Sequence, residues 1–540
     1  MSEPIIRVGG ETIVGSEFDY IIIGAGSAGC VLAHRLSADP TCRVLVLEAG
    51  PVPSRKEVSI PAAFSKLFKT DHDWAYQSEP MAHLGGRSIF IPRGKMLGGS
   101  SSINAMMHTR GNRADFDEWA ALGNPGWSYE AVLPYFKRSE NNSRGPSDYR
   151  GVDGPLEVCD PRDPHPISVA FVRAAVECGI PQNNEFNGAT QDGAALVQTN
   201  HKRGVRHSTN EGYLQPVLSR TNLAVVTDAQ ATRILFEGRR AVGVGYVRGG
   251  REEVAQAGRE VILSGGAFNS PQLLLLSGVG PADELRSLGI DVRHDLPGVG
   301  KNLLEHAAAP MFVRCRKPIT LLAAESIGSV LRYLIFRRGL LTINGPEAVA
   351  FVRTRADLPA PDIELMCVAV LYMNEALTPP PEHGFSVAAM LFKPKSRGSV
   401  TLKSTDPLTA PRIDLNLFSD ENGDDMRSVV SGLKIARRIL SAPALAPYHD
   451  GEIGPGPDAQ SDSDLASWVR SKCQTIYHPI GTCKMGHDAE AVVDARLRVR
   501  GLEGLRVVDA SIMPNHVRAH THAAVVMIGE KAADMILGQT

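Results

Sequence analysis

The stretch that decides the fold is residues 18–50, "FDYIIIGAGSAGCVLAHRLSADPTCRVLVLEAG". The apolar run at residues 20–23 predicts a buried parallel strand, and "CVLAHRLSA" after the glycines has the periodicity of a helix. The segment "RVLVLEAG" predicts a second strand. A strand, a glycine-rich turn, a helix and a second strand in this order are typical of the first unit of a dinucleotide-binding fold.

Within this stretch, "GAGSAG" places Gly24, Gly26 and Gly29 at the spacing G-x-G-x-x-G. Glycines at these positions allow a tight turn, close approach of the backbone to a pyrophosphate and close packing of helix on strand. Glu48 follows Gly29 by 19 residues and can accept hydrogen bonds from a ribose hydroxyl. The context favours a dinucleotide site over a plain structural turn, and it leaves NAD, NADP and FAD open.

The length and charge describe a globular protein with more than one domain. The chain has 540 residues, which is more than a single hydrophobic core usually serves. Its 57 basic and 59 acidic side chains give a net charge of -2. We therefore expect no attraction to nucleic acid or to an anionic membrane.

The lack of a secretory signal in residues 1–20 and the pattern of cysteines predict a cytoplasmic location. Residues 1–20 lack the basic and apolar regions of a secretory signal, and no apolar run approaches the ~18 residues of a membrane span. The eight cysteines include no C-x-x-C pair and form no short disulfide framework, which favours a reducing compartment.

Five further stretches, in order along the chain, resemble the successive signatures of the glucose-methanol-choline (GMC) family of flavin oxidoreductases. They are "DWAYQSEP" (residues 73–80), "IPRGKMLGGSSSINAMMHTRGN" (91–112), "GGAFNSPQLLLLSGVGP" (265–281), "YHPIGTCKMG" (477–486) and "VVDASIMP" (507–514). The resemblance implies FAD as the cofactor. It also implies an α/β fold, in which an FAD-binding domain has a Rossmann-like parallel sheet with the GxGxxG turn and a substrate domain has an antiparallel sheet and helices.

The resemblance further implies that both domains are discontinuous in the sequence. The FAD-binding domain is expected at residues 1–160, 205–310 and 465–540. The substrate domain is expected to consist of the segments between them, residues 161–204 and 311–464.

Apolar patterns place some elements within these segments. Residues 261–264 are expected to return to the parallel sheet, and three apolar runs predict antiparallel strands, at residues 224–226, 234–236 and 241–246. Residues 396–416 resemble the sheet of the substrate domain, and residues 425–440 resemble one of its helices.

The stretch "RGKMLGGSSSIN", residues 93–104, is rich in Gly and Ser. Its backbone can therefore pass close to a ligand and offer N–H and hydroxyl groups, although such stretches are also common as mobile surface loops. The resemblance implies that this stretch lies along the isoalloxazine of FAD. It also implies two further residues in contact with FAD, one near the adenine and one in "VVDASIMP". The implied cofactor contacts beyond the GxGxxG turn are Gly98, Gly99, Ser100, Asn104, Ala231 and Asp509.

Relatives that bond FAD covalently do so through a histidine immediately before that asparagine. This chain has Ile103 at the position. An aliphatic side chain forms no such link, so we expect FAD to be held without a covalent bond.

The stretch "HVRAHTH", residues 516–522, contains three histidines at the spacing H-x3-H-x-H. The spacing alone could serve a transition metal, because imidazole is a common ligand. The resemblance instead implies catalytic roles for His478, in the "HPIGTCKMG" stretch, and for His522, in "HTHA". It gives no role to His516 or His520, and no metal is expected. A core or capping role is the alternative for either catalytic candidate.

Oxidising an alcohol requires a base at the hydroxyl group while the carbon-bound hydrogen leaves as hydride for flavin N5. His478 is suited to this role because imidazole has an unperturbed pKa of ~6.5. His522 is expected to hydrogen-bond the substrate oxygen, at the start of a helix whose positive dipole end can stabilise the reduced flavin.

The sequence therefore predicts FAD-dependent oxidation of a small primary alcohol to an aldehyde, with oxygen or a quinone-type compound as electron acceptor. The alternative function is that of an FAD-containing hydroxynitrile lyase. Such an enzyme uses the same histidine pair for cyanohydrin cleavage without net redox change.

Overall fold

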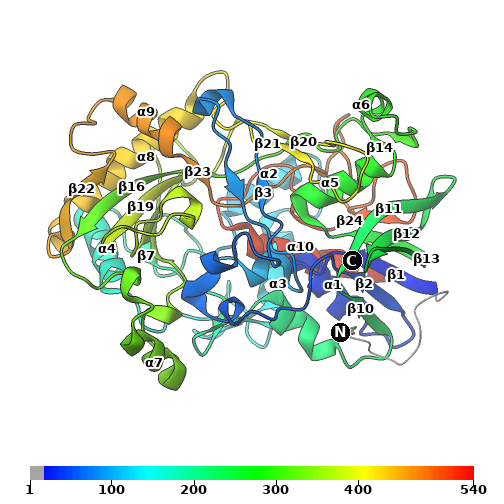
Figure 1. The fold of residues 1–540 in the computed structure, drawn as a ribbon, viewed down its shortest axis with the longest axis horizontal. Coiled ribbons are helices and arrows are strands. Elements are labelled where there is room, and N and C mark those ends of the chain that lie inside the picture. Colours follow the sequence, from blue (N-terminus) through cyan, green and yellow to red (C-terminus); the bar gives the residue numbers. More distant parts are fainter. Residues whose placement is uncertain (1–16, 540) are drawn as a thin grey trace.

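The computed structural model describes residues 17–539, and two large sheets lie at opposite ends of the molecule (Figure 1). The first sheet has seven strands. They are β1 (Glu17–Ile23), β2 (Val44–Leu47), β10 (Leu223–Val226), β11 (Ala229–Glu237), β12 (Arg240–Arg248), β13 (Arg251–Leu263) and β24 (Leu505–Val507).

Parallel pairing dominates the first sheet. Its strands follow the order β10-β2-β1-β13, all parallel, and β24 adds to β13 in parallel. The long strand β13 also pairs with β12, and β12 with β11, in antiparallel fashion. The predicted antiparallel strands at residues 234–236 and 241–246, and the return to the parallel sheet at residues 261–263, are confirmed.

The prediction for residues 224–226 is wrong in direction. These residues belong to β10, which pairs with β2 in parallel. The chain returns to the sheet through a long excursion after β2, so β10 enters in the same direction as its neighbour. Three apolar residues carry no information on strand direction.

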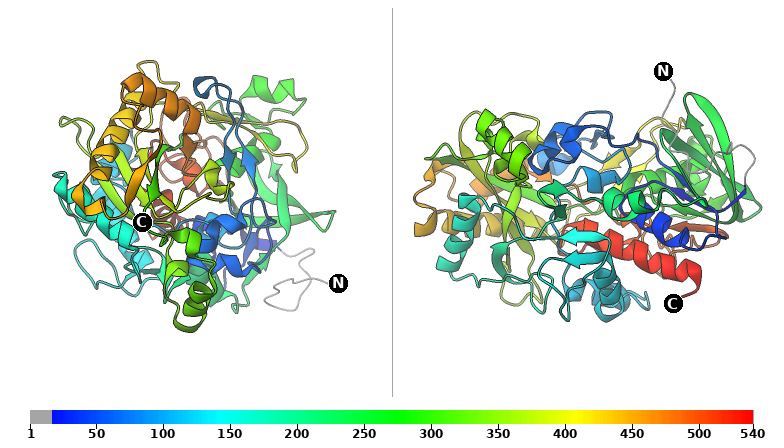
Figure 2. Two further views of the ribbon diagram at one scale, coloured as in Figure 1. Left: turned by 60° about the vertical axis from the view of Figure 1, so that its left-hand side comes forward. Right: turned by 90° about the horizontal axis from the view of Figure 1, so that it is seen from below.

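Helix α1 (Ser27–Leu36) begins inside the glycine motif and packs against α10 (Thr521–Leu537), which Figure 2 shows beside it. A Cβ atom at Gly529 would lie 3.0 Å from Cβ of Val31 and 3.3 Å from Cα of Ala28. The glycine therefore lets the two helices approach closely. This contact brings the carboxy-terminal helix to the dinucleotide turn.

The second sheet is antiparallel throughout, in the order β22-β16-β19-β18-β17-β7, with β23 on β16. Helices α4 (Pro166–Glu177), α8 (Asp424–Leu440) and α9 (Asp462–Lys472) pack on it. The strands are β7 (Gly193–Leu196), β16 (Ala307–Cys315), β17 (Pro346–Val352), β18 (Ile363–Val368), β19 (Gly384–Leu391), β22 (His449–Gly454) and β23 (Gln474–Thr475). The helix predicted at residues 425–440 is confirmed as α8, which buries Val429, Leu433 and Ala436 at helical spacing.

Residues 396–416 are not part of this sheet, contrary to the prediction. They form a separate hairpin of β20 (Ser399–Thr401) and β21 (Arg412–Asp414), which packs on α5 (Gly266–Leu276). Pro407 and Pro411 lie in its turn, and a proline lacks the N–H that a sheet ladder needs. The strands are consequently too short to extend the large sheet.

The other helices and the short strands lie outside the two large sheets. They are α2 (Arg113–Ala121), α3 (Tyr129–Ser139), α6 (Ala282–Ser287), α7 (Ile327–Phe336), β3 (Tyr76–Gln77), β4 (Phe90–Ile91), β5 (Glu140–Asn142), β6 (Leu156–Val158), β8 (His201–Lys202), β9 (Val205–Arg206), β14 (Val279–Gly280) and β15 (His294–Asp295). The predicted domain boundaries stay a prediction. One strand of the second sheet, β23, lies within the segment expected to close the FAD-binding domain.

Most of the stretch examined for a secretory signal, residues 1–16, lies outside the described residues. Within residues 17–539, no helix is both long and apolar enough to cross a membrane. All eight cysteines lie in this part of the chain and are free thiols.

Candidate active site

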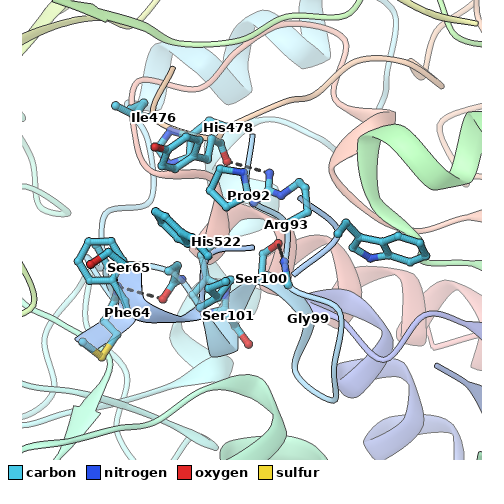
Figure 3. Close-up of a pocket in the computed structure, with 18 of the residues that line it drawn as sticks. Phe64, Ser65, Pro92, Arg93, Gly99, Ser100, Ser101, Ile476, His478 and His522 are labelled. Atoms are coloured by element: carbon cyan, nitrogen blue, oxygen red, sulfur yellow. Dashed lines mark hydrogen bonds between the residues drawn. The ribbon is translucent and has the colours of Figure 1, made fainter. Parts of the chain in front are cut away.

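A cavity of about 1120 Å³ lies between the two sheets and is lined by residues from both. The glycine turn and β11 line one part of it, and strands β16, β18 and β19 line another. His478, His522, Arg93 and the loop at residues 99–101 face the same space (Figure 3). Of the predicted site residues, all except Gly29 and Gly98 line this cavity.

The geometry of the glycine turn requires glycine. Gly24 has φ of +98°, and a Cβ atom on it would lie 2.5 Å from the carbonyl oxygen of Ser264. A Cβ atom on Gly29 would lie 1.9 Å from the carbonyl oxygen of Gly24. At Gly26, by contrast, the side facing the cavity is open, since the nearest atom to a Cβ is 4.0 Å away. The backbone is thus exposed to a ligand where α1 begins.

Glu48 is buried at the end of β2 and braces this turn. Its carboxylate accepts hydrogen bonds from the backbone N–H of Ala25 (2.8 Å) and of Gly50 (2.9 Å). Burial raises the pKa of Glu48 to about 7, against the opposing effect of the two N–H donors. The side chain also lines the cavity, so it holds the turn in place and can contact a ribose there.

The Gly/Ser stretch is an ordered wall of the cavity and not a mobile surface loop. Gly98 and Gly99 have φ of +87° and +51°, and a Cβ atom on Gly99 would lie 2.7 Å from Cα of Gly26. The Ser101 hydroxyl donates to the carbonyl of Gly98 (2.6 Å), and Ser102 donates to that of Leu97 (2.9 Å). These bonds hold the shape of the loop, and the backbone N–H of Gly98 donates to the carbonyl of Ala25 (2.8 Å), which fixes the loop against the glycine turn.

The other predicted cofactor residues are held by defined contacts. Oδ1 of Asn104 accepts from the backbone N–H of Met106 (3.0 Å) and from Arg206 (2.8 Å). Asp509 accepts from the backbone N–H of Gly266 (2.9 Å), at the start of α5, and burial raises its pKa. Ser100 and Ala231, on β11, line the cavity directly.

These residues fit a bound dinucleotide. Gly26 caps α1 without a side chain, so the first-turn N–H groups of the helix stay available where Gly26 and Ser27 line the cavity. The cavity is long enough to include Glu48 and Ala231 as well as the two histidines His478 and His522. Phosphate, ribose and ring groups therefore each meet suitable partners.

The tautomer of His478 follows from its neighbours. Nε2 of His306 lies 3.1 Å from the carbonyl oxygen of Phe392, which only accepts, so this nitrogen carries the proton. Burial lowers the pKa of His306 well below its usual value, so its Nδ1 is an acceptor. Nδ1 of His478 lies 3.1 Å from that nitrogen and donates to it. Nε2 of His478 then keeps a free lone pair, and it has no protein hydrogen bond within residues 17–539.

Three further contacts fix the backbone around His478. Tyr477 has φ of +68°, a conformation that is uncommon for a residue other than glycine, and Arg93 donates to its carbonyl at 2.8 Å (Figure 3). The carboxylate of Glu305 accepts from the backbone N–H of His478 at 2.7 Å. His516, stacked on His306 with ring centroids 3.5 Å apart, donates to the His478 carbonyl at 2.9 Å.

Electrostatics keep His478 uncharged. Burial lowers its pKa well below the usual value, and positive charge on His520, His516 or Arg93 would lower it further. Burial also raises the pKa of Glu305 to about 8. An unprotonated imidazole is therefore the stable form of His478 at neutral pH.

The structure brings His520, not His522, into contact with His478. The two ring centroids are 4.9 Å apart with the planes at 88°. Nε2 of His520 also lies 3.3 Å from Oε1 of Glu364, a fully buried carboxylate on β18. Nδ1 of His522 hydrogen-bonds Oγ of Ser27 at 3.0 Å instead, which directs it to the glycine turn. Burial lowers the pKa of His522 to about 3.

The histidine-rich stretch forms no metal site in the part of the chain that the structure describes. No group of three or more His, Cys, Asp or Glu side chains within residues 17–539 is placed to hold a metal ion. His516 and His520 are engaged with protein partners, as described above.

Several residues that surround His478 have no role predicted from the sequence. They are Arg93, Glu305, His306, Glu364, His516 and His520. The spacing of "HVRAHTH" indicated only a possible metal site, and no role was predicted for His520. Arg93 and His516 lie in stretches that were quoted for other reasons. Glu305, His306 and Glu364 carry no signal in the sequence, because they are distant from His478 along the chain.

Comparisons with known proteins cover nearly the whole chain. Family models described as GMC oxidoreductase match residues 18–308 and residues 394–529. An alcohol dehydrogenase [acceptor] from Pseudomonas putida is 43% identical over 529 residues, which cover 96% of this chain and 96% of that protein.

Two solved structures have the same fold. A pyridoxine 4-oxidase from Mesorbium loti has 31% sequence identity and a TM-score of 0.89, covering 97% of this chain and 99% of that one. A formate oxidase from Aspergillus oryzae, studied for FAD modification, has 29% identity and a TM-score of 0.90, covering 98% and 99%.

Proposed function

This chain belongs to the GMC oxidoreductase family and is an FAD-dependent oxidoreductase, and we propose that it oxidises a primary alcohol to the aldehyde. The names of two relatives support an alcohol, since one is an alcohol dehydrogenase and the other a pyridoxine oxidase. The observation that carries the proposal is the free Nε2 lone pair of His478, which faces the cavity beside His520.

His478 is the base in this proposal. Its Nε2 accepts the hydroxyl proton of the alcohol, while Nδ1–H stays bonded to His306. Because burial lowers the pKa of His478, the imidazole is unprotonated and ready to accept before the substrate binds. FAD, when bound, supplies the acceptor for the hydride that leaves the carbinol carbon. The products are the aldehyde, one proton on His478 and a reduced cofactor.

His520 is the proposed partner of His478 at the substrate oxygen, the role that the sequence analysis assigned to His522. The Glu364 carboxylate lies within hydrogen-bonding distance of Nε2 of His520 and fixes the ring. In this role Nδ1 of His520 also carries a proton and donates it to the substrate oxygen, because the hydroxyl proton of the alcohol goes to Nε2 of His478. Glu364 thereby orients a side chain that holds the substrate oxygen close to Nε2 of His478. His522 is the second residue of α10 and is proposed to contact the cofactor side of the cavity.

The start of α10 contributes electrostatically. His520 is the N-cap residue and makes no side-chain capping bond, so the first N–H groups of the helix remain available. Thr521 and His522 line the cavity at this end. The positive end of the helix dipole therefore faces the space where negative charge develops as the cofactor is reduced.

Other residues are proposed to hold FAD. The GxGxxG turn and the first turn of α1 would hold the pyrophosphate, Glu48 the ribose, and Ala231 the adenine side. The wall formed by residues 98–104 would lie along the isoalloxazine, with Asp509 keeping α5 in place behind it. Ile103, at the position of the covalent link in some relatives, offers only aliphatic carbon, so binding is proposed to be non-covalent.

An anaerobic absorbance screen tests the proposed function. Purified holoenzyme is mixed with a series of primary alcohols without oxygen, and the oxidised-flavin absorbance is followed before air is admitted. We expect bleaching with at least one alcohol and formation of its aldehyde. Recovery of the absorbance in air would identify oxygen as acceptor, and recovery only with a quinone would identify a dehydrogenase. Cyanohydrin cleavage with no bleaching by any alcohol would contradict the proposal and support the lyase alternative.

A further inference from the structure

Helix α7 (Ile327–Phe336) presents a row of large apolar side chains to solvent. The helix projects from the rest of the fold (Figures 1 and 2). Four residues follow the i, i+4, i+7, i+8 spacing of one helix face. Their exposed fractions are 80% for Ile327, 51% for Leu331, 60% for Leu334 and 66% for Ile335. An apolar face of this kind on a projecting helix indicates a contact surface.

This surface continues into the substrate cavity. Leu334 is exposed and also lines the cavity, as do Leu322 and Leu377 from neighbouring segments. Val330, on the same helix, is half-buried and also lines the cavity. The apolar face of α7 therefore borders the cavity mouth.

Basic side chains lie on α7 and on the segments next to it. A Cβ atom on Gly204 would lie 2.6 Å from the Arg337 carbonyl oxygen, which places the β8–β9 turn against the end of α7. Three carboxylates, Glu157, Asp163 and Glu325, pair with some of these cations. The cations are more numerous: Lys66, Lys202, Arg203, Arg332, Arg337 and Arg338.

We propose that α7 docks on an anionic lipid bilayer and holds the cavity mouth against the lipid surface. Helices that lie in the plane of a membrane interface combine an apolar face with flanking Lys and Arg in this way. The overall charge of -2 does not reveal this local excess of cations.

A second copy of the chain fits this surface less well. A symmetric dimer through α7 would place the same cations opposite one another and would cover the cavity mouth. Anionic headgroups neutralise the cations, and a fluid apolar phase covers Ile327, Leu331 and Ile335 without closing the path to the cavity.

Vesicle flotation with the holoenzyme tests the proposal. The probes are vesicles of phosphatidylcholine alone and of phosphatidylcholine with phosphatidylglycerol, at low and high salt. The variant L331E/I335E changes two exposed side chains that do not line the cavity. The matched control is L122E/L408E, at residues 51% and 56% exposed elsewhere on the surface.

We expect wild type and control to float with the anionic vesicles, and high salt to weaken the association. The fraction of the variant that floats with the anionic vesicles should be at least about tenfold smaller than that of wild type. The rate at which a water-soluble alcohol reduces its flavin should be unchanged. The proposal is overturned if wild type floats with neither vesicle, or if the variant floats as well as the control. It is also overturned if wild type is a dimer that α7 substitutions convert to monomer without any vesicle binding.

Discussion

Nδ1 of His306 lies 3.1 Å from Nδ1 of His478, and this single contact determines which nitrogen of His478 faces the cavity. The carbonyl of Phe392 orients His306 by accepting a hydrogen bond from its Nε2–H. Nδ1 of His306 can therefore only accept a hydrogen bond. A backbone carbonyl directly after β19 of the second sheet thus determines the proton position on the proposed base.

Replacing His306 by Phe should slow flavin reduction by about 10- to 100-fold, because Nδ1–H of His478 would be buried without an acceptor. The ring of Phe keeps the stacking on His516, so FAD content and melting temperature should change little. His306→Asn, whose amide oxygen can accept from His478, should recover much of the rate. The assay is anaerobic flavin reduction across a pH series. An unchanged rate in the Phe variant, or an equally slow Asn variant, would contradict the positioning role.

A second prediction distinguishes the two histidines at the start of α10. His520→Ala should lower the flavin-reduction rate at least about tenfold, since it removes the imidazole that contacts His478. His522→Ala removes a side chain that bonds Ser27, so its main effect should be on FAD affinity. Both are measured on samples with equal FAD content. If His522→Ala shows the larger loss of rate, the partner role belongs to His522 as the sequence analysis predicted.

A third prediction concerns pH. His478 acts unprotonated, and its pKa is lowered by burial and by positive charge on its neighbours. A lowered pKa moves protonation to more acid conditions, so kcat/KM should stay level as pH falls through ~6.5, the usual imidazole value, and decline only below it. Samples returned to neutral pH must regain full activity at each point. A decline centred at or above pH ~6.5 would show that the pKa of the base is not lowered.

Much of the first sheet could be predicted from residues 18–50, because a glycine motif between two apolar strands requires both close helix packing and an open phosphate site. The family, the α/β fold class and the FAD dependence predicted from the motifs are confirmed. Strand direction at β10 could not be predicted, since it depends on the path of a long crossover and not on the three apolar residues.

The site could be predicted only in part for a similar reason. His306 and His478 are 172 residues apart, and nothing in the sequence indicates that they touch. Choosing between His520 and His522 depends on where α10 begins, because the helix start turns one imidazole to His478 and the other to Ser27. Boundaries of helices are less well defined by sequence than their existence.

A fourth prediction addresses the link between cofactor and protein. Acid precipitation should release all of the yellow chromophore into the supernatant, because Ile103 has no atom that forms a bond to FAD. The measurement is the flavin absorbance of supernatant and of redissolved pellet. Colour that stays with washed pellet would show a covalent link elsewhere in the chain.

The most direct test of the account is the anaerobic reduction rate of His478→Ala against wild type, with an alcohol that bleaches the wild-type enzyme. FAD should remain bound in the variant, because the glycine turn and Glu48, which are proposed to hold the pyrophosphate and the ribose, are unchanged. The account predicts that reduction slows by about 10²- to 10⁴-fold, as expected for a lost general base. A His478→Ala enzyme that holds FAD and reduces it as fast as wild type would contradict the account.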